Sequence, residues 1–124
     1  MIDEVVAFVR ARLDERERDA AAAAGEVGPD WYYDTRHGRV ASHREQDLVA
    51  TGSQDHLGRE CGAHIARHDP ASVLREVAAQ RHLIDDTHWG GGPETEDAYH
   101  QICRILATAH AGHPDYKTEW APYP

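Results

Sequence analysis

Two cysteines and two histidines have the residue types and the spacing of a zinc site. His64 and His68 follow Cys61 by three and seven residues, so a helix through this stretch places all three side chains on one face. Cys103, on the apolar face of a later helix, would supply the fourth ligand of a Cys2His2 set. In a second interpretation both cysteines are small core residues and both histidines are half-buried at a helix end, where positive charge is favoured. We favour this structural interpretation, because three ligands of the zinc site would come from one helix.

The doublet His68-Asp69 suggests a second kind of metal chemistry, that of phosphohydrolases built on a His-Asp pair. Further candidate ligands near it in sequence are His64, His82, Asp85 and Asp86. Such an enzyme needs several helices that converge on the metal and an open position for water. Asp69-Pro70 has a simpler explanation, because aspartate is a favoured N-cap and proline a favoured first helical residue. The sequence therefore predicts that one helix ends just before Asp69 and that the next begins at Pro70.

No serine or cysteine has the surroundings of a catalytic nucleophile. The three serines, Ser42, Ser53 and Ser72, lie outside any Gly-x-Ser-x-Gly elbow, and neither cysteine has a nucleophile motif around it. The glycines at 90–92 lack the Lys-Ser/Thr ending of a phosphate loop, and acidic residues follow them. We therefore predict a linker here, no catalytic residue and no cofactor site other than the candidate zinc site.

The chain is acidic and rich in histidine. Its 124 residues include 22 Asp and Glu against 13 Lys and Arg, which gives a formal net charge of −9. This balance disfavours direct binding of nucleic acid through its phosphates and favours a basic protein as partner. Ten histidines add positive charge as the pH falls through about 6.5.

The sequence also indicates a compartment. No apolar run approaches the roughly 18–20 residues that a membrane span needs, and the first residues are acidic rather than basic as in a signal peptide. Two cysteines are too few for a disulfide framework, so we expect both to be thiols. We therefore expect a cytoplasmic protein that does not enter a membrane. The sequence leaves the oligomeric state open.

The apolar pattern predicts one α+β domain over residues 1–124. In order, we expect an amphipathic helix over 1–24, a small antiparallel sheet over 31–51, two or three packed helices over 54–110 and an extended tail over 111–124. The first helix has an apolar face only as far as Leu13. Its alanine-rich second half permits either a close approach to another helix or a solvated end, and we favour the solvated end. In the tail, Tyr116, Trp120 and Tyr123 could hold the chain against the body of the fold.

The sheet is predicted from Trp31-Tyr32-Tyr33, a glycine-containing turn and Val40-Ala41-Ser42, which together have the form of a β-hairpin. Residues 47–51 could add a third strand. A sheet this small is only marginally stable by itself, so we expect its aromatic face to pack on helices rather than to form an exposed patch for a partner.

Three helices are predicted after the sheet, over 54–67, from Pro70 to Ile84 and over 94–110. In the first, Leu57, Cys61 and Ile65 share a face. Gly58 and Gly62 weaken it but form a smooth edge that another element could approach closely. The second helix has an apolar stripe made of Val73, Leu74, Val77, Leu83 and Ile84, which we expect at the centre of the core.

Two blocks of sequence resemble the hallmark blocks of a family of small, uncharacterised actinobacterial and actinophage proteins. These blocks are HIARHDPASVLREV, at residues 64–77, and AGHPDYKTEWAP, at residues 111–122. The alanine-rich start that leads to a proline and tryptophan pair also fits, although Asp30 separates Pro29 from Trp31. The resemblance implies no activity, because the family is a domain of unknown function. It implies a bacterial or phage protein, in the setting of a mobile element.

The sequence favours binding without catalysis. An acidic accessory protein that recognises a basic protein partner fits the charge and the missing catalytic motifs. A small zinc protein is the alternative, with Cys61, His64, His68 and Cys103 as ligands, and the His-Asp hydrolase is a more distant one.

Overall fold

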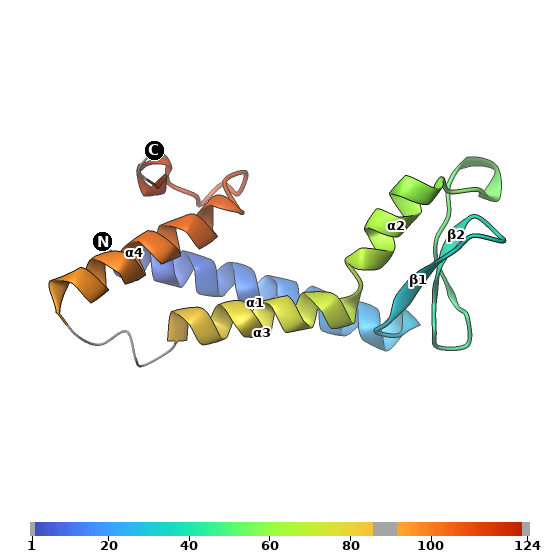
Figure 1. Cartoon of the computed structure of the whole chain (residues 1–124), viewed down its shortest axis with the longest axis horizontal. Helices are drawn as coiled ribbons and strands as arrows, with labels where there is room; N and C mark the ends of the chain where they lie inside the picture. Colours follow the sequence, from blue (N-terminus) through green and yellow to red (C-terminus); the bar gives the residue numbers. More distant parts are fainter. Residues whose placement is uncertain (1, 86–91, 123–124) are drawn as a thin grey trace. The chain divides into compact units, whose positions relative to one another are not determined.

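The computed structural model describes the backbone of residues 2–85 and 92–122, and the side chains from residue 4 onward. Asp86 and the first two glycines of the predicted linker at 90–92 lie outside the described residues, and so does Tyr123. Figure 1 shows the elements in order: α1 (Ile2–Val27), β1 (Trp31–Asp34), β2 (Arg39–Ser42), β3 (Leu48–Ala50), α2 (Arg59–Arg67), α3 (Pro70–Asp85) and α4 (Pro93–Thr108). The predicted α+β class, with a helix, a small antiparallel sheet and further helices, is confirmed.

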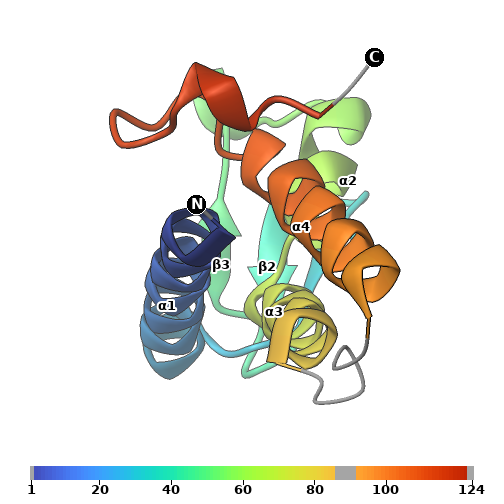
Figure 2. The ribbon, with the colours of Figure 1, turned by 90° about the vertical axis from the view of Figure 1, so that its left-hand side faces the viewer.

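The chain divides into two compact units, and α1 and α3 each contribute to both. One unit is residues 16–77, and the other is residues 1–15 together with 78–124. Figures 1 and 2 show that α1 and α3 lie alongside each other. In the second unit, Arg10 is 2.5 Å from Asp85 and Arg81 is 2.6 Å from Asp14. These exposed ion pairs align the helices but contribute little stability, about 0–1 kcal/mol each.

In unit 16–77 the three strands form an antiparallel meander in the order β1-β2-β3. Trp31 pairs with Ser42 and Asp34 with Arg39, which is the register of the predicted hairpin. The last three residues of the central strand β2 are buried. β3 is the predicted third strand, shortened to three residues.

Helix α2 packs on this sheet through a glycine. A Cβ atom at Gly62 would lie 2.2 Å from a carbon of the Tyr33 ring, so no larger residue fits here without a shift. The Tyr33 hydroxyl donates a 2.6 Å hydrogen bond to the carbonyl of Leu57. The predicted close approach is therefore confirmed at Gly62, whereas open space surrounds Gly58.

Helix α2 begins later than the predicted residue 54. Gln54 and Asp55 have φ of 57° and 61°, a left-handed conformation that no α-helix contains. Leu57 donates its amide to the carbonyl of Gly38, in the β1–β2 turn, at 2.7 Å. The prediction was wrong for residues 54–58 because this long-range bond takes an amide that a helix would use.

The end of α1 is joined to the sheet by side chains. Gly28 has φ of 100° and donates its amide to the carbonyl of Ala24 at 2.8 Å, which ends the helix. The guanidinium of Arg44 donates to the carbonyls of Gly25 and Glu26 at 3.3 and 2.5 Å. These bonds satisfy carbonyls that the last turn of a helix leaves without partners.

The alanine-rich half of α1 is partly covered. Ala20 is 7% exposed, and Ala23 and Ala24 are half-buried. The interpretation of this half as a solvated end was therefore wrong. A run of alanines does not indicate whether another element packs against it, because the small side chain suits both a tight contact and a solvated surface.

The core of the other unit is apolar and draws on α1, α3 and α4. Its buried residues include Val5, Val9, Leu13, Ile84, Cys103 and Ala107. Of the stripe predicted for α3, Val77 and Ile84 are buried, but Leu83 is 38% exposed. The stripe is therefore narrower than its sequence pattern indicates.

The C-terminal tail packs on α1 around Phe8. The centroid of its ring lies 5.1 Å from that of Trp120, 5.6 Å from that of His113 and 6.0 Å from that of Tyr116. Trp120 is buried within a short 3-10 turn, Thr118–Trp120. The predicted attachment of the tail by Tyr116 and Trp120 is confirmed.

Arg12 of α1 reinforces this attachment. Only 8% of Arg12 is exposed, and its guanidinium lies over the Phe8 ring, 4.9 Å from the centroid. One Nη atom is 2.9 Å from Nδ1 of His113, and the other donates to Glu15 at 3.0 Å. A buried arginine is expensive to leave without partners, so these contacts fix the start of the tail.

Candidate functional site

Asp69 is the N-cap of α3, as predicted, and it also binds the sheet. Its Oδ1 atom accepts the amide of Ser72 at 2.9 Å, which is the N-cap hydrogen bond. Its Oδ2 atom accepts the amide of Trp31, at the start of β1, at 3.0 Å. Only 8% of the residue is exposed. One carboxylate therefore connects the start of a helix to the start of a strand 38 residues away in sequence.

The electrostatics of Asp69 favour the charged form. Burial raises the pKa of this carboxyl group. The hydrogen bonds from Ser72 and Trp31 and the charge of Arg75 together lower it by more than burial raises it, so the pKa lies below its ordinary value. Both oxygens already accept backbone amides. With both oxygens engaged and only 8% of the residue exposed, little of the carboxylate is open to a metal ion, which argues against a His-Asp hydrolase centre.

Every backbone amide in the first turn of α3 already donates a hydrogen bond within the protein. Pro70 has none, Ala71 donates to the carbonyl of Pro29 at 3.0 Å, and Val73 donates to the carbonyl of Asp69 at 3.0 Å. Together with the amide of Ser72, these are the donors that a helix start normally leaves for a ligand. This helix start is therefore a structural joint and not an anion site.

The four predicted zinc ligands have different surroundings. Cys61, His64 and His68 are all exposed, on α2 and at its end. The rings of His64 and His68 are close, with centroids 4.6 Å apart. Cys103 is fully buried in α4. In the described ranges, no group of three or more His, Cys, Asp or Glu side chains is arranged to hold a metal ion.

Burial controls the chemistry of Cys103. It raises the pKa of the thiol, while a hydrogen bond with Tyr99 acts in the opposite direction. The Tyr99 hydroxyl donates to the carbonyl of Ile84 at 2.7 Å, and burial raises its own pKa to about 12. A thiol that stays protonated is a poor zinc ligand and a poor nucleophile. Cys103 is therefore a core residue, as the structural interpretation expects. The same interpretation was wrong to bury Cys61 and to place His64 and His68 half-buried, because all three are exposed.

A hollow of about 310 Å³ lies in unit 16–77 between α1, α3 and the start of β1. Ala20, Ala23, Trp31 and Val73 give it an apolar lining, and Arg16, Asp19 and His68 are the charged and polar residues of its lining. Trp31 is half-buried, and its indole N–H donates to the carbonyl of Gly28 at 2.9 Å. Its backbone amide is held by Asp69, so this tryptophan is fixed from two sides. We call this feature the Trp31 hollow.

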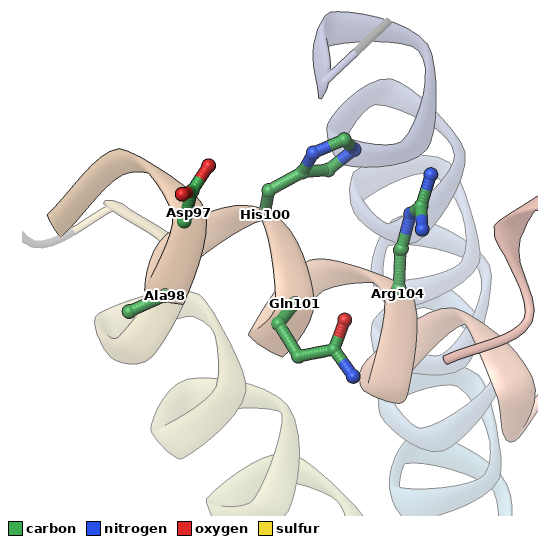
Figure 3. Close-up of a pocket in the computed structure, with 5 residues that line it drawn as sticks. All are labelled: Asp97, Ala98, His100, Gln101 and Arg104. Carbon is green, nitrogen blue, oxygen red and sulfur yellow. The ribbon is translucent and has the colours of Figure 1, made fainter. Parts of the chain in front are cut away.

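A second hollow, of about 380 Å³, lies along α4. Figure 3 shows Asp97, His100 and Arg104 projecting from the same side of the helix, and Gln101 pointing elsewhere. Burial and the charge of Arg104 lower the pKa of His100, whereas Asp97 raises it. This favours a neutral imidazole at neutral pH. The described lining comes from one helix and includes no nucleophile, so the hollow has polar character but not the parts of a catalytic site.

Sequence reasoning missed the Trp31 hollow. The aromatic run was expected to pack on helices, and Tyr33 does so against Gly62. Trp31 also lies beside helices, at residues of α1 and α3 that are distant in sequence, but there it lines a hollow. The one local signal is the Gly28-Pro29 turn, which presents the carbonyl that the indole binds.

These features define a small α+β protein with a buried polar joint and a preformed apolar hollow. The chain belongs to the family of unknown function DUF6221, which it matches over residues 2–122. No curated protein and no solved structure matches it. None of the helices in the described ranges has both the length and the apolar character required to cross a bilayer.

Proposed function

We propose that the chain is a non-catalytic, acidic accessory protein that binds a basic protein partner in the cytoplasm of an actinobacterium or of a cell infected by its phage. The Trp31 hollow is the observation on which this proposal rests. The two sequence blocks that resemble actinobacterial and actinophage proteins support the source. The oligomeric state is left open by this proposal.

The Trp31 hollow has the features of a protein-binding hot spot. Hot spots are enriched in tryptophan, lie in well-packed apolar pockets and are surrounded by polar contacts. The two hydrogen bonds of Trp31 hold the ring in place before a partner arrives, which reduces the entropy lost on binding. A volume of about 310 Å³ suits one or two apolar side chains from a partner rather than a large cofactor.

Charge supports a basic partner. Residues 16–77 contain eleven Asp and Glu against eight Arg, and the remaining 62 residues contain eleven against five basic residues. Both units are therefore net negative. Asp19, in the lining of the hollow, offers a carboxylate to a basic residue that flanks the inserted apolar side chain, whereas Arg16 of the same lining is paired with Glu76 at 3.2 Å. The net negative charge attracts a basic partner over a long range. Because salt screens the attraction, association should become slower as the salt concentration increases.

Filling the hollow provides the test. Ala23→Leu adds three carbons to the lining without introducing a poor helix former, and Ala22→Leu is a matched control on an exposed position of the same helix. We expect a partner captured from the native host's lysate, and then purified, to bind Ala23→Leu more weakly by about 1–2 kcal/mol. Ala22→Leu should bind normally. Equal binding by both variants, or association insensitive to salt, would contradict the proposal.

The alternative, a zinc protein with Cys61, His64, His68 and Cys103 as ligands, has less support. Cys103 is buried with a raised pKa, while the other three residues are exposed. Elemental analysis of untagged protein separates the alternatives. One zinc ion per chain whose removal unfolds the protein would favour the four-ligand site.

A further inference from the structure

His64 and His68 form a close pair at the C-terminal end of α2. His64 is in the last turn of the helix, and His68 is the residue that ends it. Their ring centroids are 4.6 Å apart, with an angle of 48° between the planes. Both side chains are exposed, so an ion in solution can reach them.

One hydrogen bond leaves a metal-binding nitrogen of His68 available. Its Nδ1 atom lies 2.8 Å from the carbonyl oxygen of His64. Because a carbonyl oxygen can only accept, Nδ1 carries the proton in this bond, and Nε2 of the neutral ring has a free lone pair. Histidine ligands in metal sites commonly donate their other N–H to a backbone carbonyl, which fixes the orientation of the ring.

The position at a helix end also favours a cation. The last carbonyls of a helix give this end a partial negative charge, and α2 has nine residues, enough for two full turns. Arg67 is nearby in the same turn and opposes this effect, but it is exposed, so solvent screens its charge. Imidazole nitrogen is a preferred ligand of zinc, copper and nickel.

We propose that His64 and His68 together bind one divalent transition-metal ion, such as Zn²⁺, through one ring nitrogen each, with water in the remaining positions. Two nitrogens that bind one tetrahedral zinc ion at about 2.0–2.1 Å lie about 3.3 Å apart. Because each ring nitrogen lies off the centroid of its ring, two rings with centroids 4.6 Å apart can bring one nitrogen each to this separation. The site differs from the four-ligand set because neither Cys61 nor Cys103 belongs to it. It is inferred without using the proposed partner binding, although His68 also lines the Trp31 hollow.

Calorimetric titration of the untagged full chain with Zn²⁺ at neutral pH tests the proposal. We expect one site per chain that is weakened about tenfold or more by either His64→Gln or His68→Gln, because each variant removes one of the two ligands. His82→Gln and Cys61→Ser should bind like the wild type. His82 is the matched control, because it is an exposed histidine in the last turn of another helix.

Several outcomes would overturn the proposal. These are no Zn²⁺ binding by the wild type, binding unchanged by His64→Gln, or an equal loss in His82→Gln. Loss of binding in Cys61→Ser would also contradict it, since the thiol would then be a ligand. Circular dichroism of the metal-free variants shows that their fold is retained. His64→Gln is the decisive variant, because the backbone carbonyl that orients His68 is unchanged in it.

Discussion

Helices α3 and α4 both begin with a proline, but their starts are built differently. At α3, the buried Asp69 caps the first turn and also holds the amide of Trp31. At α4, Gly92 precedes Pro93 and provides no side-chain cap. Its carbonyl accepts the amides of Thr95 and Glu96 at 3.1 and 3.2 Å, so the bonds of this start are local.

The comparison shows that one sequence signal can have two structural meanings. Proline at the first helical position sets where a helix begins in both cases. The residue before it decides whether that start also takes part in tertiary structure. A carboxylate with two acceptor oxygens can serve the helix with one and a distant strand with the other, which glycine cannot do.

The largest expected effect comes from Asp69→Ala. Loss of an N-cap alone costs about 1 kcal/mol, and leaving the amide of Trp31 without its acceptor adds about 1–3 kcal/mol. We therefore expect a loss of about 2–4 kcal/mol in the free energy of unfolding, measured by denaturant titration. A loss near 1 kcal/mol would mean that the contact with Trp31 contributes little and that the two helix starts are energetically alike.

Asp69→Asn tests the charge of the same joint and should have a smaller effect. Asparagine remains a good N-cap but offers an N–H₂ group to the amide of Trp31, so we expect a loss of about 1–2 kcal/mol at neutral pH.

The pH dependence of this difference follows from the pKa of Asp69. Because the folded-state pKa lies below the unfolded value, the charged carboxylate stabilises the fold above the unfolded pKa, about 3.9. That stability is lost as the pH falls through the folded pKa. The gap between wild type and Asp69→Asn should therefore be constant above about pH 5 and shrink as the pH falls below about 4 and through the folded pKa. A gap that stays constant through this fall in pH would show that the charge has no role.

The smallest effect is expected from Gly92→Ser, which adds a side-chain cap to α4. Gly92 has an extended conformation with φ of −81° and ψ of −178°, and a Cβ atom there would meet open space. Serine in place of an N-cap glycine should stabilise the helix by only about 0.3 kcal/mol. Thermal melting of this variant beside Asp69→Ala measures how different the two helix starts are. A gain as large as the loss in Asp69→Ala would remove the distinction.

Local signals made much of the fold predictable. Asp69-Pro70 located the start of α3 and its cap, and the aromatic and glycine pattern located the hairpin. The start of α2 was not predictable, because the bond from the Leu57 amide to Gly38 joins residues 19 positions apart. Alanine is equally ambiguous in α1, where Ala20 is buried although its sequence surroundings suggest a solvated helix.

The candidate site was also predictable only where local sequence spacing determines it. The spacing of His64 and His68 predicted that they share a helical face, and their rings are indeed adjacent. Spacing does not report burial, so it did not separate the exposed Cys61 from the buried Cys103. The Trp31 hollow depends on three segments that meet only in the folded chain, so no local pattern could reveal it.

Each unit has its own tryptophan in the described part of the chain, which makes intrinsic fluorescence a selective reporter. Trp31 is half-buried in unit 16–77, and Trp120 is buried beside Phe8 in the other unit. With Trp89 replaced by phenylalanine, Trp31→Phe and Trp120→Phe would each leave a single emitter in one unit. In each protein, a fluorescence melt that coincides with the melt followed by circular dichroism is the signature of one cooperative domain, and a separate fluorescence transition would mean that the unit with the emitter unfolds on its own.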